Sequence, residues 1–374
     1  MSALELSDFR RLVIKVGSSL LIGADDAVNR AWLEGLAEDI AELQKAGHEV
    51  LIVSSGAIAI GSSVLGINRR RARLEDLQAA AAAGQVQLVH AWQEALARHG
   101  IAAAQVLLTP EDTENRRRFL NARGTLAKLL ENRVVPVINE NDTVATEEIR
   151  YGDNDRLAAR VAQLVMADGL VLLSDVDGLY TADPGKDEGA EHIPEVRRIG
   201  NDILAIAGET RSDVGSGGMA TKVQAARIAT HAGCSTIVTS GKVEHPLAAL
   251  AGGGMCTVFR AEGTPAAARK QWLAGVLDVR GELRLDDGAV QALRAGKSLL
   301  PVGVAEVVGA FRRGDVVTLV DTSARELGRG LAEYSDEEAR QLVGCQSEEI
   351  EERLGYRGSS VMVHRDDLVL FDHD

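Results

Sequence analysis

A glycine-rich segment that ends in a lysine is the strongest chemical signal in this sequence. Residues 215–222 read GSGGMATK. Glycines let a backbone approach an anion closely, and the start of a helix offers unpaired N–H groups at the positive end of its dipole. Lys222 would lie in the first turn of that helix, where a cation is mildly unfavourable. A residue placed against local preference is a candidate for function, so we interpret the segment as a phosphate-binding loop. A flexible loop with a surface lysine is the alternative.

Two common nucleotide motifs do not fit this segment. Its first six residues match G-x-G-x-x-A, but a dinucleotide site requires a preceding strand, and the upstream residues AGETRSDV are polar. A Walker loop requires G-x-x-x-x-G-K-[ST], whereas Lys222 follows Thr221 and precedes Val223. The segment therefore predicts anion binding outside both motifs.

A second lysine, Lys15, interrupts the apolar run RLVIKVG at residues 11–17. Such a run predicts a buried strand, and a lysine inside it is costly unless its charge meets an anion. Lys15 is therefore a second candidate phosphate ligand. The alternative is an ordinary lysine at the edge of a sheet.

Short apolar runs alternate with helical patterns up to about residue 260. We expect strands within residues 11–17, 49–56, 102–109, 134–142, 169–178 and 234–241. We expect helices within residues 31–47, 74–99, 117–132, 154–167 and 219–233. Strands that are apolar throughout and alternate with helices predict an α/β fold, a three-layer αβα sandwich around a mainly parallel sheet.

Polar residues follow four of these strands, at residues 17–19, 54–56, 139–142 and 174–175. Ligands of open parallel sheets bind beyond the carboxyl ends of the strands. The sequence therefore predicts one site at this edge, to which several strands contribute.

Six segments together resemble the glutamate 5-kinase family of the amino acid kinase superfamily. They are LVIKVGSSLL, IVSSGAIAIG, NENDTVA, YGDNDRLAA, LLSDVDGLYTADP and GSGGMATKVQAA, which run in the family's order from residue 11 to about residue 270. Farther on, KSLLPVGV and FRRGDVV are similar to a PUA domain. The resemblance implies a kinase domain at 1–262, a linker at 263–280 with a short helix, and a small β-rich PUA domain at 281–372.

The resemblance also implies an activity. The family phosphorylates the γ-carboxylate of L-glutamate with ATP, and Mg2+ accompanies the ATP. The product, γ-glutamyl phosphate, begins proline biosynthesis, and proline is the expected feedback inhibitor of a homo-oligomeric enzyme. The residues suit this chemistry, because an ionised carboxylate needs no general base and the reaction depends on positioning and charge stabilisation.

The resemblance assigns three catalytic residues: Lys15 and Lys222 would contact the ATP phosphates, and Asp155 would orient both lysines. The DNDR sequence also suits Asp155 as a simple acid at a helix start. The expected ATP-binding residues are Lys15, Ser174, Asp175, Ser216, Gly217, Gly218, Met219, Ala220, Thr221 and Lys222. Ser174 and Ser216 stand where the family pattern leads us to expect threonine, and the hydroxyl group is kept in both.

Ser55, Asp142 and Asn154 match the family's substrate positions, and Asp153 and Asn139 are second choices. For Ser55, a helix cap is the alternative interpretation. The sequence assigns no protein ligand to the metal ion.

The composition excludes several classes of protein. The chain has 374 residues and a formal net charge of -14, which does not suit a protein that coats nucleic acid. Its three cysteines form no CxxC pair, so we expect reduced thiols and a cytoplasmic enzyme. We find no signal peptide and no apolar stretch near the roughly 20 residues of a membrane helix.

Two other functions remain open on the sequence alone. Kinases for N-acetylglutamate, aspartate or carbamate belong to the same superfamily and would share the phosphate-binding residues. PUA domains also serve RNA modification, but acidic residues outnumber basic ones after residue 281 and aromatic residues form only 3% of the chain. Nucleic acid is therefore not an expected partner.

Overall fold

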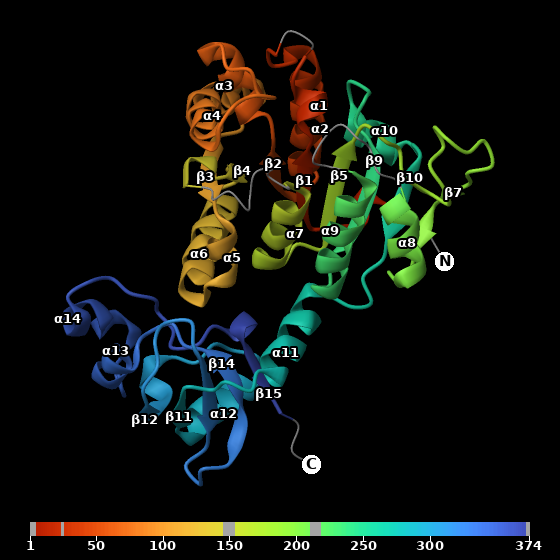
Figure 1. The fold of residues 1–374 in the computed structure, drawn as a ribbon. Helices are drawn as coiled ribbons and strands as arrows, with labels where there is room; N and C mark the ends of the chain where they lie inside the picture. Colours follow the sequence, from red (N-terminus) through yellow and green to blue (C-terminus); the bar gives the residue numbers. More distant parts are fainter. Residues whose placement is uncertain (1–4, 24–25, 145–153, 210–217, 372–374) are drawn as a thin grey trace. The chain divides into compact units, whose positions relative to one another are not determined.

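The computed structural model describes residues 5–23, 26–144, 154–209 and 218–371 (Figure 1). The chain forms two compact units, one of Met1–Glu114 with Ala122–Pro265 and one of Asn115–Asn121 with Ala266–Asp374. The first unit ends at Pro265, and the expected kinase-domain boundary at residue 262 stays a prediction. Most of the expected linker belongs to the second unit, because α11 (Pro265–Gly275) places Leu273 in that unit's core.

A sheet of eight described strands forms the centre of the first unit, in the order β3-β4-β2-β1-β5-β9-β10-β8 (Figure 1). These strands are β1 (Arg11–Val16), β2 (Glu49–Ser54), β3 (Ala103–Leu108), β4 (Val135–Glu140), β5 (Gly169–Ser174), β8 (Glu195–Val196), β9 (Ser235–Ser240) and β10 (Cys256–Phe259). Neighbouring strands from β3 to β9 are parallel, whereas β10 is antiparallel to β9. The expected mainly parallel sheet is confirmed. A separate hairpin joins β6 (Leu179–Tyr180) and β7 (His192–Ile193).

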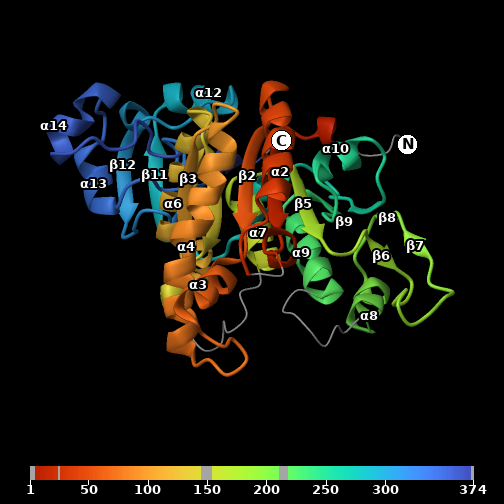
Figure 2. The same cartoon turned by 90° about the horizontal axis from the view of Figure 1, so that it is seen from above.

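Helices cover both faces of this sheet, as can be followed in Figure 2. They are α1 (Ser18–Leu21), α2 (Arg30–Lys45), α3 (Ala57–Leu65), α4 (Leu74–Ala97), α5 (Pro110–Glu114), α6 (Arg116–Glu131), α7 (Asn154–Leu164), α8 (Asn201–Glu209), α9 (Met219–His231) and α10 (Pro246–Ala251). Side chains of α2 and α4 form one core with Leu12, Ile14 and Val16 of β1. Because side chains alternate along a strand, Val13 and Lys15 face the other side, where α7 packs against β1 and α9 packs against α7. The three-layer αβα architecture is confirmed.

The sequence pattern did not indicate α3, which directly follows the polar turn after β2. It packs closely against α4, because a Cβ at Gly61 would lie 1.7 Å from the backbone oxygen of Ala80. A Cβ at Gly84 would lie 1.9 Å from the backbone oxygen of Ala57. Only glycine fits at these two contacts. This close packing holds α3 and the Ser55–Gly56 turn at the carboxyl edge of the sheet.

The second unit is a small mixed sheet with short helices, in agreement with the expected β-rich domain. Its described strands run in the order β12-β11-β13-β14-β15. The strands are β11 (Gly281–Leu285), β12 (Val304–Gly309), β13 (Val316–Val320), β14 (Glu326–Leu331) and β15 (Leu368–Leu370), and the helices after α11 are α12 (Asp287–Arg294), α13 (Asp336–Gln341) and α14 (Ile350–Leu354). A buried ion pair between Arg269 and Asp367, with 3.1 Å between Nη2 and Oδ1, fixes α11 to this unit.

The structure also bears on the membrane and cysteine expectations. Within the described residues, no helix has the length and apolar character that crossing a bilayer requires. Cys234, Cys256 and Cys345 are free thiols, and burial raises the pKa of Cys256.

Candidate active site

Lys15 lies near the carboxyl end of β1, in the middle of the sheet. It pairs in register with Val53 of β2 and Leu172 of β5. The residue is only 7% exposed. A buried ammonium group requires a charged or polar partner, since its desolvation alone is costly.

Asp155 is that partner, and it binds Lys222 as well. The Lys15 Nζ atom lies 2.5 Å from Oδ1 of Asp155, and the Lys222 Nζ atom lies 3.2 Å from Oδ2. Asp155 stands in the first turn of α7 and Lys222 in the first turn of α9. Residues far apart in the sequence therefore meet at one carboxylate, and the structure brings together all three residues predicted to be catalytic.

The electrostatics keep this carboxylate ionised. Burial by itself would raise the pKa of Asp155, but the attraction of Lys15 and Lys222 outweighs burial and holds the pKa below its usual value. Two ammonium groups thus share one carboxylate at a desolvated position. These three groups together carry a net positive charge, which suits an incoming anion.

The start of α9 adds donors beside Lys222. Gly218 is the N-cap residue and provides no side-chain cap, so the first N–H groups of the helix have no intrahelical acceptor. The Thr221 hydroxyl lies 3.1 Å from Oδ2 of Asp155 and 2.8 Å from the Gly218 carbonyl oxygen. Met219 and Ala220 are partly exposed at this end. Ser216 and Gly217, also predicted to bind ATP, lie outside the described residues.

Ser174 and Asp175 lie at the end of β5, the neighbour of β1. Ser174 is buried, and its hydroxyl donates to Oδ1 of the next residue, Asp175, at 3.0 Å. The Asp175 side chain is exposed at the carboxyl edge. Both predicted nucleotide ligands therefore lie at the edge that carries Lys15.

Three of the predicted substrate-binding candidates form one hydrogen-bonded group. The Asn154 side-chain amide donates to the Ser55 hydroxyl at 2.7 Å and to Oδ1 of Asn139 at 3.0 Å. The buried Oδ1 of Asn154 has no hydrogen-bond partner among the described residues. An acceptor left open in this way can receive a donor from a bound molecule. Asp153 lies outside the described residues.

Asp142 occupies a different environment, two residues beyond β4. It is half-buried, and loss of solvent raises its pKa to about 6. A carboxylate that is poorly solvated gains more than an exposed one from a cation placed beside it. Asp142 is therefore suited to hold an ammonium group.

Two polar residues of α4 support this group and were not singled out from the sequence. The Oε1 atom of Gln85 accepts a hydrogen bond from the Asn139 side chain at 2.8 Å. The indole N–H of Trp92 donates to the Ser54 hydroxyl at 3.0 Å, next to Ser55. A glutamine on the buried face of an alanine-rich helix is the sequence signal that would have found Gln85.

The described residues include no group of three or more His, Cys, Asp or Glu side chains that could hold a metal ion. Mg2+ usually binds through one or two carboxylates together with substrate phosphates and water. The exposed carboxylate of Asp175 is a ligand of this kind. The donor set at this edge therefore fits Mg2+ that is held mainly by a nucleotide.

Comparisons with known proteins show to which family the chain is similar. The sequence profile of the amino acid kinase family matches residues 10–240, and that of the PUA domain matches residues 275–354. A glutamate 5-kinase of Rhodopseudomonas palustris (strain TIE-1) is 55% identical over 371 residues, which cover 99% of each chain. A glutamate 5-kinase of Bradyrhizobium sp. (strain BTAi1) is also 55% identical, over 99% of this chain and 98% of that protein.

The solved structures that match this chain have much lower sequence identity. Carbamate kinase from Giardia lamblia bound to AMP-PNP aligns with a TM-score of 0.48 and 18% identity, over 68% of this chain and 100% of that one. UMP kinase from Ureaplasma parvum aligns with a TM-score of 0.47 and 17% identity, over 67% of this chain and 98% of that one.

Proposed function

Because this chain belongs to the glutamate 5-kinases of the amino acid kinase family, we propose that it transfers the γ-phosphoryl group of ATP to the γ-carboxylate of L-glutamate. The chain also carries a PUA domain. The product would be γ-glutamyl phosphate, the first intermediate towards proline. The observation that best supports the proposal is the convergence of two buried lysines, Lys15 and Lys222, on Asp155.

The chemistry requires charge stabilisation rather than proton transfer. A γ-carboxylate oxygen of glutamate forms a bond to the γ-phosphorus, and the bond from that phosphorus to the β–γ bridging oxygen breaks, so that ADP leaves. Negative charge spreads over the transferred group in the transition state. Lys15 and Lys222 would stabilise that charge, and Asp155 would hold both ammonium groups in position before ATP binds.

The ATP phosphates would lie against the start of α9. The N–H groups of Gly218, Met219 and Ala220, which have no acceptor within the helix, and its positive dipole end favour a phosphate. We assign the adjoining Ser216 and Gly217 to the same loop, and Ser174 to the nucleotide. Bound Mg2+ would neutralise phosphate charge, and Asp175 would be its protein ligand.

Glutamate would bind on the other side of Lys15, at the ends of β2 and β4. Asp142 would accept the α-ammonium group, which explains why a poorly solvated carboxylate is useful there. The Ser55 hydroxyl, which accepts from the Asn154 amide, would donate to a carboxylate oxygen of the substrate. The open Oδ1 of Asn154 would accept a hydrogen bond from the substrate's ammonium group. Asn139 would fix the Asn154 side chain.

Trapping the acyl phosphate tests this function directly. The full-length protein is incubated with ATP, Mg2+, L-glutamate and hydroxylamine, and glutamyl hydroxamate and ADP are measured. Equal amounts of hydroxamate and ADP with glutamate are expected, and much less product with N-acetylglutamate or aspartate. ADP release without hydroxamate, or faster turnover of another acid, would contradict the assignment.

Regulation, assembly and location are further parts of the proposal. We expect L-proline to inhibit at or over the glutamate site, so that inhibition weakens as glutamate rises. Light scattering should give the mass of a homo-oligomer. The need for ATP and the three free thiols favour the cytoplasm. Inhibition by proline that does not depend on the glutamate concentration would contradict binding at the glutamate site. A measured mass equal to that of one chain would contradict the homo-oligomer.

A further inference from the structure

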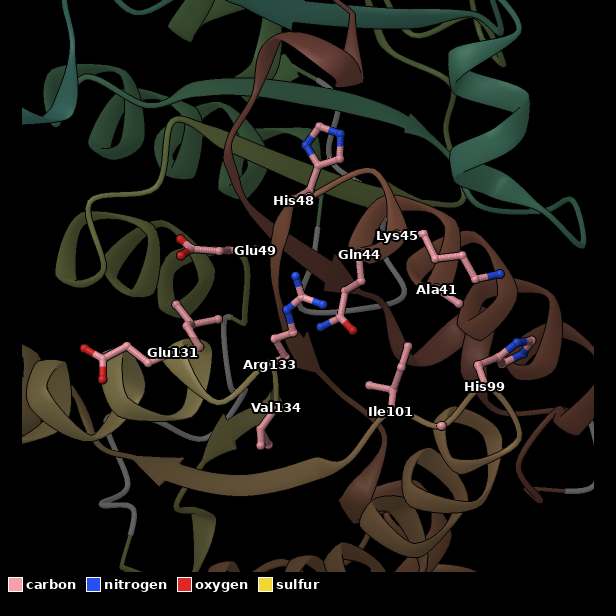
Figure 3. A pocket seen from close by; sticks show the side chains of 13 residues that line it. Ala41, Gln44, Lys45, His48, Glu49, His99, Ile101, Glu131, Arg133 and Val134 are labelled. Carbon is pink, nitrogen blue, oxygen red and sulfur yellow. The ribbon is translucent and has the colours of Figure 1, made fainter.

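A cavity of about 450 Å³ lies at the amino-terminal edge of the sheet in the first unit, at the opposite ends of the strands from Lys15 (Figure 3). Three helix-to-strand turns surround it, namely those from α2 to β2, from α4 to β3 and from α6 to β4. Its volume is within the usual range for small-molecule sites, roughly 300–1,000 Å³. None of its lining residues belongs to the candidate active site.

The three turns share one backbone conformation, and each has one residue with a positive φ. That residue is Gly47 (95°) in the first turn, Gly100 (73°) in the second and Arg133 (57°) in the third. In each turn the N–H of the positive-φ residue donates to the carbonyl oxygen of the residue three positions before it. The N–H of the following residue donates to the carbonyl oxygen five positions before that residue. Glycine adopts this conformation freely, whereas a residue with a Cβ is strained in it. Two of the three turns have glycine at this position. The third has Arg133, which is strained there and lines the cavity.

The charge of Arg133 is not neutralised by the acids of the cavity. Within the described residues, no ion pair is found for Arg133. The cavity's two acids are held by other cations: Glu49 lies 2.7 Å from Nε of Arg11, and Glu131 lies 2.9 Å from Nζ of Lys128. The cavity therefore presents an available positive charge.

Polar and apolar groups accompany this arginine. In Figure 3 the side chains of Arg133 and Gln44 extend towards the middle of the opening, and His99 lies at its margin. Ile101 and Val134 supply apolar surface. The His48 ring is fixed at the wall by a 2.5 Å hydrogen bond from its Nδ1 to the carbonyl oxygen of Phe9.

We propose that this cavity binds a small organic anion that carries carboxylate or phosphate groups, with Arg133 as its charge partner. A guanidinium group matches both carboxylate and phosphate in a two-pronged geometry. Gln44 and His99 provide hydrogen-bonding groups beside it, and the two aliphatic side chains contact the carbon skeleton. The ligand does not compete with ATP, because a six-residue strand of about 20 Å separates the two edges of the sheet.

Calorimetric titration of the full-length protein tests the proposal. The probes are succinate, inorganic phosphate and 3-phosphoglycerate, each added in the presence of saturating AMP-PNP and Mg2+. Arg133→Gly removes the guanidinium and leaves the turn in a conformation that glycine favours. Met166→Gly is the matched control, because Met166 has a positive φ (51°) in the equivalent turn after α7 and does not line the cavity.

At least one probe should bind the wild type and Met166→Gly with the same Kd, and Arg133→Gly should weaken binding about 10-fold or more. Comparison of succinate with phosphate then shows which anionic group the cavity selects. Arg133→Gln, with a thermal melting curve for each variant, separates loss of charge from loss of folding. The proposal is overturned if no probe binds at millimolar concentration, if Arg133→Gly and the wild type bind equally, or if the probes bind only when AMP-PNP is left out.

Discussion

The cationic side chains at the two edges of the central sheet differ in burial and in pairing. At the carboxyl edge, Lys15 and Lys222 are buried and share Asp155. At the amino edge, Arg133 is exposed in an open cavity. A desolvated and fixed cation stabilises charge that develops during a reaction, because it needs no reorganisation at that moment. An exposed arginine can supply affinity but not this preorganisation. The carboxyl edge is therefore suited to catalysis, and the amino edge is suited to ligand binding alone.

Removal of the buried cation should have the largest effect. We expect Lys222→Ala to lower kcat by on the order of 10²–10³, as for loss of one transition-state donor. Arg133→Gly should leave kcat within about twofold when no ligand is added, because it removes an exposed cation at the opposite edge. Steady-state kinetics on both variants measures the contrast. A near-normal kcat for Lys222→Ala would remove this lysine from the catalytic role.

The next effect concerns the affinity for glutamate. Asp142→Ala should raise the apparent KM for glutamate about 10-fold or more, since it removes the charge proposed to hold the ammonium group. The KM for ATP should change less than about twofold. Equal changes in both constants would contradict the assignment of Asp142 to glutamate.

The pKa of Asp142 predicts a pH dependence for the same contact. Burial raises this pKa to about 6, so the side chain is ionised above that pH and neutral below it. A neutral carboxyl group attracts an ammonium group weakly, and kcat/KM for glutamate should therefore fall by about tenfold per pH unit below pH 6. Asp142→Asn should lower kcat/KM and flatten this limb of the profile. If kcat/KM of Asp142→Asn falls below pH 6 as steeply as that of the wild type, a group other than Asp142 causes the decrease.

A smaller effect should follow from the support behind the site. Trp92→Phe removes the donor to Ser54 and should cost about 1 kcal/mol of unfolding free energy and raise the KM for glutamate a few-fold. Trp32→Phe is the matched control, because its indole N–H donates to the Gly241 carbonyl oxygen at 2.6 Å, after β9. It should lose similar stability in urea unfolding and keep its KM. A KM that changes equally in both variants would exclude a specific positioning role for Trp92.

The smallest effect concerns stability at the amino edge. Arg133→Gly relieves the strain of a positive φ but increases the entropy of the unfolded chain, so the unfolding free energy should change by less than about 1 kcal/mol. Gly47→Ala, in the equivalent turn, should destabilise by about 1 kcal/mol or more, although no atom lies within 4 Å of the added Cβ. Urea unfolding of both variants checks the contrast. Strong destabilisation by Arg133→Gly would show that the arginine has a structural role.

Local sequence patterns predicted the sheet and the edge that carries the candidate site. Lys15 was recognisable because a charge interrupts an apolar strand, and Lys222 because it follows glycines at a helix start. The helix α3 was missed because Gly56, Gly61 and two serines weaken its local signal. Its formation depends on the close contact with α4, which is a tertiary effect.

Other parts of the site depend on contacts between distant segments. Gln85 meets Asn139, which is 54 positions away in the sequence, and only the folded chain brings them together. The cavity at the amino edge is built in the same way from three separate turns. No local pattern reveals such contacts, so the supporting residues and the cavity could not be predicted.

A crystal structure with AMP-PNP, Mg2+ and glutamate tests the central claim most directly. We predict that the Nζ atoms of both Lys15 and Lys222 lie within hydrogen-bond distance, about 3 Å, of phosphate oxygens. The account is contradicted if the nucleotide is well ordered and either amine lies more than about 6 Å from every phosphate oxygen, because at that distance it makes no hydrogen bond to the transferred group.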